Sequence, residues 1–152
     1  MKTLIAVAVG LLLPLGVLAS DKPKVEDTPK PTEERPCVAH FTEEGSFFKG
    51  KTYKTWQEFP IADKAAVFQN VAQAVAANSW GTVNANKDIG IITAGQAVTM
   101  GEGSVAPLSV VVKQKSGGPV RVEANFGTAG MQKASTDTVR TELCKLLEAA
   151  VD

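Results

Sequence analysis

The chain has 152 residues, of which 16 are basic and 16 acidic, so its formal net charge is zero. This balance argues against a nucleic-acid-binding protein, which requires a basic excess on one face. Two cysteines and one histidine supply too few ligands for a metal centre, so we expect neither a metal nor another cofactor.

Residues 1–19 have the layout of a signal peptide. Lys2 precedes an apolar run from Leu4 to Leu18 that is interrupted by Pro14 and two glycines. A transmembrane anchor is the alternative, but an anchor needs about 20 apolar residues with charges on both sides. We therefore expect cleavage after Ala19, a periplasmic or secreted location and no membrane span in the mature protein.

The next segment, residues 20–36, is predicted to be a disordered linker. It contains four prolines, four basic and five acidic residues and no aromatic residue. Such a composition buries too little apolar surface to offset the entropy lost on ordering. Its mixed charge does not suit a polybasic contact with lipid or nucleic acid, so a spacer role is favoured.

The remaining residues, 37–152, suit a single domain with one core. The two cysteines, Cys37 and Cys144, lie near its two ends. In an exported protein one disulfide between them is the simplest arrangement. Free reactive thiols are the alternative, although the Cys-x-x-Cys spacing of redox enzymes is absent.

Residues 47–59, FFKGKTYKTWQEF, are rich in aromatic and β-branched residues and predict the first strand. Tyr53 and Phe59 share one parity of this strand, and Trp56 lies on the other. Because a linker precedes it, we expect this strand at the edge of a sheet, where exposed rings and unpaired backbone groups recruit partners.

A helix is predicted after Pro60. Asp63 is a suitable N-cap, and apolar residues follow at helical spacing from Val67 to Val75. Seven alanines between Ala62 and Ala77 raise the helix propensity and make the helix thin. A thin helix packs close to a sheet.

From residue 80 onward the pattern changes to alternation with short turns, which is typical of an antiparallel meander with one covered face. Val110 and Val112 share one parity, while Lys113 and Lys115 suit the solvent side. We predict strands at residues 80–85, 89–100, 105–115 and 119–126, with turns at 86–88, 101–103 and 116–118.

Two glycines, Gly90 and Gly95, interrupt the apolar segment DIGIITAGQAV. Glycine weakens a strand, so its presence there indicates a bend, a bulge or a close approach to a ligand. The apolar parity also shifts between Ile91 and Ile92. We therefore predict a bulge or sharp bend near Gly95 that curves the sheet around a helix.

Ser135 predicts the N-cap of a final helix whose apolar stripe includes Val139, Leu143 and Leu147. The expected order is strand, helix, four strands, helix. This order predicts an α+β fold in which a curved antiparallel sheet carries two helices on one face.

The segment AVFQNVAQAVAANSWGTVNANKDIGIITA, a helix, a turn and a hairpin ending in Asp88-x-Gly-Ile-Ile, resembles two groups of bacterial proteins. They are small exported domains of unknown function and the helix-grip modules of the outer-membrane assembly lipoprotein C. As a pattern the resemblance extends from Tyr53 to Leu147. It implies protein binding or scaffolding in the envelope without catalysis. No cysteine follows the apolar run, so the lipid attachment of those lipoproteins is not expected.

Residues able to perform catalysis do not form a recognisable motif. His40 precedes the first predicted strand, and a general base must be held rigidly against its partner. The side chains of Glu43 and Glu44 are adjacent and diverge, and Asp88 lies in a turn, where aspartate commonly binds its own backbone. We assign no catalytic residue and predict that the protein is not an enzyme.

The aromatic residues Trp56, Tyr53 and Trp80 are the candidate binding residues, with core packing as the alternative. A binding or scaffolding module that contacts an envelope protein is the favoured function. The alternative is a carrier of a small apolar ligand held between a helix and the curved sheet.

Overall fold

The computed structural model describes residues 35–78, 80–81, 83–98 and 105–152. The predicted signal peptide, the linker up to residue 34 and the predicted turn at 101–103 lie outside these residues. Within them, no helix is long and apolar enough to cross a membrane.

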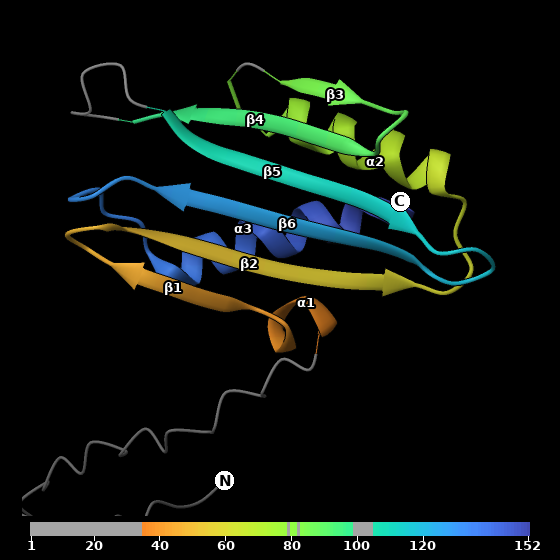
Figure 1. Ribbon diagram of the computed structural model, residues 1–152, viewed down its shortest axis with the longest axis horizontal. Coiled ribbons are helices and arrows are strands. Elements are labelled where there is room, and N and C mark those ends of the chain that lie inside the picture. The colour runs from red at the N-terminus through yellow and green to blue at the C-terminus, as the bar shows by residue number, and fades with distance from the viewer. Residues whose placement is uncertain (1–34, 79, 82, 99–104) are drawn as a thin grey trace, which may run out of the picture. The chain divides into compact units, whose positions relative to one another are not determined.

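Six strands form one antiparallel sheet in the order β1-β2-β6-β5-β4-β3 (Figure 1). The strands are β1 (Thr42–Ser46), β2 (Gly50–Phe59), β3 (Asn84–Asn86), β4 (Ile91–Ala97), β5 (Val105–Gln114) and β6 (Val120–Thr128). The helices are α1 (Pro36–Ala39), α2 (Lys64–Ala77) and α3 (Thr136–Glu148), and a 3₁₀ turn, η1 (Ala149–Val151), follows α3.

The helices α2 and α3 lie on one face of this sheet, so the predicted α+β fold is confirmed (Figure 1). Alternate strand residues such as Ile92, Val110 and Val122 are fully buried against the helices. Burial of the aliphatic and aromatic side chains of the core is the main force that holds the two layers together. We call the opposite side of the sheet, which carries Trp56 and Arg121, the open face.

Both predicted helix caps are confirmed. The Asp63 carboxylate accepts a hydrogen bond from the Ala66 amide at 2.8 Å. The Ser135 hydroxyl oxygen accepts one from the Thr138 amide at 3.4 Å. Each cap satisfies an amide that has no partner within its own helix, which determines where α2 and α3 begin.

The first part of the domain differs from the prediction. Residues 47–49 form the turn of a hairpin between β1 and β2, and the predicted strand therefore begins at Gly50. β1, with the sequence TEEGS, was not predicted because all of its residues are exposed and none is apolar. The expectation of an edge strand was wrong, since β2 lies between β1 and β6.

The predicted bulge at Gly95 was also wrong. β4 and β5 pair in one unbroken register, in which Gly95 lies opposite Pro107. The backbone carbonyl of Gly95 accepts a hydrogen bond of 2.6 Å from the amide of Gly81. A Cβ atom on Gly95 would lie 2.2 Å from Cγ1 of Val105. Glycine at position 95 therefore permits close packing.

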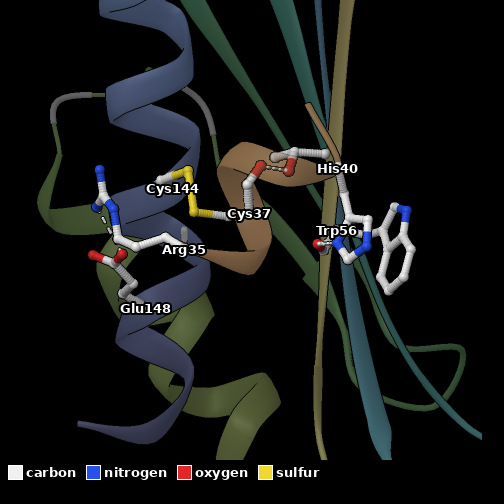
Figure 2. The surroundings of a disulfide bond; sticks show 7 residues. Arg35, Cys37, His40, Trp56, Cys144 and Glu148 are labelled. Atoms are coloured by element: carbon white, nitrogen blue, oxygen red, sulfur yellow. Dashed lines mark hydrogen bonds and ion pairs between the residues drawn. A yellow bond between two sulfur atoms is a disulfide. The ribbon is translucent and has the colours of Figure 1, made fainter. Parts of the chain in front are cut away.

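The predicted disulfide between Cys37 and Cys144 is confirmed and joins α1 to α3 (Figure 2). Beside it, Arg35 forms an ion pair of 2.8 Å with Glu148. The hydroxyl of Thr55 on β2 donates a hydrogen bond to the carbonyl of Cys37. α1 has only four residues, so these contacts, rather than helix propensity, hold it beside the sheet.

Candidate functional site

Trp56 lies on the open face, as its parity predicts, while Tyr53 and Phe59 point into the core. In β2 it pairs with Glu123 of β6. The pairing of β1 with β2 ends at Lys54, so at Trp56 no strand pairs with the edge of β2 that faces away from β6. α1 occupies this position (Figure 2).

His40, directly after α1, stacks on Trp56. The centroids of the two rings are 3.4 Å apart and their planes differ by 14° (Figure 2). Nδ1 of His40 lies 3.1 Å from the backbone carbonyl of Trp56. A carbonyl oxygen only accepts hydrogen bonds, so Nδ1 carries the proton and donates it. The hydrogen bond and the stack together fix the orientation of both rings.

Arg121 of β6 also contacts the indole. Its guanidinium carbon lies 3.8 Å from the centroid of the Trp56 ring, within the range of a cation–π interaction. Nε of Arg121 is 2.7 Å from the Glu123 carboxylate, and a terminal nitrogen is 3.6 Å from that of Glu58. Glu123 in turn forms a 2.7 Å ion pair with Lys113 of β5. A charged network from three strands thus contacts the aromatic ring through Arg121.

Two hollows lie on the open face on either side of Arg121. The first has a volume of about 370 Å³ and is lined by His40, Trp56, Arg121, Glu123 and neighbouring residues. The second, of about 420 Å³, is lined by Glu58, Lys113, Gln114, Lys115, Pro119 and Arg121. Both volumes fall within the usual range of ligand pockets, about 300–1,000 Å³.

The other two predicted binding residues lie on the helix side of the sheet. Tyr53 is fully buried, and its ring centroid is 6.1 Å from those of Phe41 and Phe126. Trp80 is half-buried with its ring edge against Phe126 at 5.6 Å. The structure therefore does not bring Tyr53 and Trp80 together with Trp56.

Trp80 lines a smaller hollow on the helix side, of about 210 Å³. Its wall consists of Trp80, Phe126, Val139 and Leu143 together with four polar residues, Asn78, Gln96, Thr138 and Glu142. Here the sheet lies close to the start of α3.

A second polar cluster joins β1 to α3. The Glu43 carboxylate forms an ion pair with Lys51 and accepts a hydrogen bond of 2.6 Å from the Thr136 hydroxyl. The hydrogen bond from Lys51, which has the larger effect, and the one from Thr136 both lower the pKa of Glu43 from its ordinary value of 4.5. The same contact raises the pKa of Lys51 above 10.5. The cluster is a structural link between the hairpin and the helix.

In the part of the chain that the structure describes, no three His, Cys, Asp or Glu side chains lie close enough together to hold a metal ion. The candidate site on the open face consists instead of a tryptophan, a histidine and a set of paired charges.

Comparison with known proteins finds no matching family model and no matching curated protein.

Sequence reasoning identified Trp56 but missed its two neighbours. His40 appeared isolated because it lies sixteen positions before Trp56 in the sequence, and the chain between them includes a hairpin that was not predicted. Arg121 lies opposite Lys113, which the alternation of β5 had placed on the solvent side. A basic residue on the same face of the sheet as an exposed tryptophan is the signal that could have indicated their contact.

Proposed function

We propose that this protein is a non-catalytic binding module of the bacterial envelope that captures a partner protein on the open face around Trp56. The observation that carries this proposal is the arrangement of His40 and Arg121 against a half-exposed indole beside two hollows. Tryptophan and arginine are the residues most enriched among those that dominate binding energy at protein interfaces.

Preorganisation supports the proposal. Contacts with His40 and Arg121 already restrict the Trp56 ring, so less side-chain entropy is lost when a partner covers it. The backbone beneath the ring is paired with β6 and is bordered on its other side by α1, which is tied to α3 by the disulfide. A fixed aromatic anchor on a rigid support suits a permanent binding surface.

The charge pattern suggests how the surface selects its partner. On the open face Arg121 lies between Glu58 of β2 and Lys113 of β5, and Glu123 follows two residues along β6, so acidic and basic groups alternate over a short distance. A partner with complementary alternating charges gains register and specificity from such a surface. This pattern does not suit a uniformly charged polymer.

A site-specific crosslinking experiment tests the proposal. A photoreactive amino acid replaces Asn125, an exposed residue that lines the first hollow, and another replaces Gln69, an exposed residue of α2, as the control. We expect one discrete crosslinked partner from envelope extract with the probe at position 125 and none with the probe at 69. Trp56→Ala and Arg121→Lys, which keeps the charge but loses the planar guanidinium, should each weaken the crosslink.

Equal crosslinking from both positions, or an undiminished crosslink in the Trp56→Ala variant, would contradict the proposed surface. A melting curve of each variant separates lost binding from lost folding, because a variant that has unfolded shows no cooperative transition.

The hollow beside Trp80 favours the second candidate function, a carrier of a small apolar ligand. Trp80, Phe126, Val139 and Leu143 provide an apolar wall between α3 and the sheet. Its volume of about 210 Å³ is below the usual range for drug-sized ligands, about 300–1,000 Å³. Native mass spectrometry of the purified protein tests this function, since a carrier retains a co-purified apolar molecule that a Val139→Trp variant loses.

The envelope location is part of the same proposal. It is supported by the signal-peptide layout of residues 1–19 and by the disulfide, which persists in oxidising compartments. The intact mass of the protein recovered from the periplasm or the medium should correspond to a chain that begins at Ser20. A chain that retains its first 19 residues there would contradict cleavage after Ala19.

A further inference from the structure

Two loops meet at the end of the sheet that lies farthest from α1. One is the β1–β2 turn at residues 47–49, and the other is the segment after β6 at residues 129–131 (Figure 1). The amide of Met131 donates a hydrogen bond of 2.6 Å to the carbonyl of Phe47. A Cβ atom on Gly130 would lie 2.4 Å from the carbonyl of Phe48, so the two backbones are in direct contact.

These loops expose three large apolar side chains, those of Phe47, Phe48 and Met131, which we call the apolar tip. Phe48 is 81% and Met131 72% exposed, and Phe47 is also exposed. The rings of Phe47 and Phe48 pack edge to face with centroids 5.5 Å apart. Exposed apolar groups gathered at one place on a surface commonly mark a contact site.

The backbone at the tip is strained in order to present Met131. Its φ angle is 64°, the one positive value among the described residues that are not glycine. A left-handed conformation is unfavourable for a residue with a Cβ atom, and glycine avoids this cost. Backbone strain that is retained at an exposed apolar side chain indicates that this side chain has a function.

Two lysines, Lys49 and Lys133, flank the tip, and both are exposed. Neither forms an ion pair with a residue that the structure describes, whereas nearby Lys51 is held by Glu43 and Lys54 by Glu44. The charge immediately around the tip is therefore positive. Apolar side chains flanked by basic residues are the pattern of proteins that lie at the surface of an anionic membrane.

We propose that the apolar tip inserts into the interfacial region of an anionic lipid bilayer, with Lys49 and Lys133 against the lipid headgroups. A second copy of the chain is a poor alternative occupant. Three side chains bury at most about 150–250 Å² each, whereas a stable interface buries about 800 Å² per partner. Pairing two tips would also bring their lysines together.

The first test measures flotation of the purified, disulfide-bonded protein with vesicles. We expect binding to vesicles of phosphatidylcholine and phosphatidylglycerol, weaker binding to phosphatidylcholine alone, and a decrease with salt. Phe48→Ser should reduce binding to the anionic vesicles by roughly tenfold, because the apolar contribution of one ring is lost. Lys49→Gln combined with Lys133→Gln should remove the preference for anionic vesicles.

Two further variants make the result specific. Met131→Gly removes the side chain at a backbone conformation that glycine adopts freely, so it should lose membrane binding without a lower melting temperature. Ile61→Ser removes a fully exposed apolar side chain just beyond the opposite end of β2, and this variant should bind as the unmodified protein does.

Three outcomes would overturn the proposal. They are no binding of the unmodified protein to anionic vesicles, equal losses in the Phe48→Ser and Ile61→Ser variants, and a concentration-dependent dimer that Phe48→Ser abolishes. Because Trp56 lies on the open face, the Trp56→Ala variant should retain vesicle binding, so this test and the partner-capture test fail independently.

Discussion

The ring centroids of His40 and Trp56 lie 3.4 Å apart, although the chain between the two residues forms a β-hairpin. The stack is not part of the regular sheet pairing, and it joins the end of α1 to β2 at a point where β1 no longer pairs with that strand. Aromatic pairs contribute about 0.5–1.5 kcal/mol beyond the area that they bury.

Replacement of Trp56 by alanine should lower the free energy of unfolding by only about 1–2 kcal/mol, because the ring is half-buried on the open face. Replacement of the fully buried Tyr53 by alanine should cost about 3–5 kcal/mol. Urea unfolding of both variants tests this difference. A loss for Trp56→Ala as large as that for Tyr53→Ala would place the tryptophan in the core.

Removal of the disulfide in the Cys37→Ser, Cys144→Ser double variant should destabilise the domain by about 4–5 kcal/mol in the chain-entropy model, since the bond joins residues 107 positions apart. Unfolding by guanidinium chloride measures the loss. Thiol titration of the unreduced, denatured protein should find no free thiol, and two reactive thiols would contradict the bridge.

Gly90→Ala should destabilise the fold more than Gly117→Ala, and the difference isolates a steric clash. Both glycines have φ near 70°, so alanine is strained at either position by about 1–2 kcal/mol. At Gly90 a Cβ atom would also lie 2.2 Å from the Val112 carbonyl, whereas at Gly117 nothing lies within 4 Å. Equal losses in thermal melts of the two variants would rule out the clash.

Glu43→Gln should remove a pH-dependent part of the stability. The pKa of Glu43 is lowered in the folded state, so its contribution is complete above pH 4.5 and is lost as the pH falls through the folded-state value. The unmodified protein should therefore be more stable than the variant near neutral pH, and the two should converge in acid. Thr136→Val removes one of the two hydrogen bonds and should show a smaller effect of the same sign. A constant difference at all pH values would contradict the assigned cause.

Enrichment in aromatic and β-branched residues was sufficient to predict most of β2, and alternation predicted β5 and β6. Cap residues predicted the starts of α2 and α3. These features depend on neighbours close in sequence. β1 and α1 could not be predicted in this way. The side chains of β1 are exposed, and α1 is held by a disulfide, an ion pair and the hydrogen bond from Thr55. Such contacts are long-range and leave no periodic pattern.

The shift of apolar parity at Ile91 had a different cause from the predicted bulge. Ile91 lies on the open face opposite Val111 and forms a half-buried apolar pair with it, while Ile92 points into the core. Both sides of the sheet are therefore apolar at this point. A continuous apolar run can arise from a strand that is covered on both faces as well as from a change of register.

The site on the open face was predictable only at Trp56, from its parity. The contacts of His40 and Arg121 with the ring depend on the hairpin and on the pairing of β2 with β6.

The disulfide on one side of the sheet is linked through α1 to the binding surface on the other. Cys37 is bonded on the helix side of the sheet, and the chain reaches His40 on the open face only three residues later. A covalent bond in the core thus sets the position of a surface imidazole. While the thiols are reduced, α1 lacks this covalent anchor, and non-covalent contacts such as the hydrogen bond from Thr55 are left to hold it beside the sheet. The surface around Trp56 therefore depends in part on the oxidation of two thiols on the other side of the sheet, which couples this surface to the redox state of its surroundings.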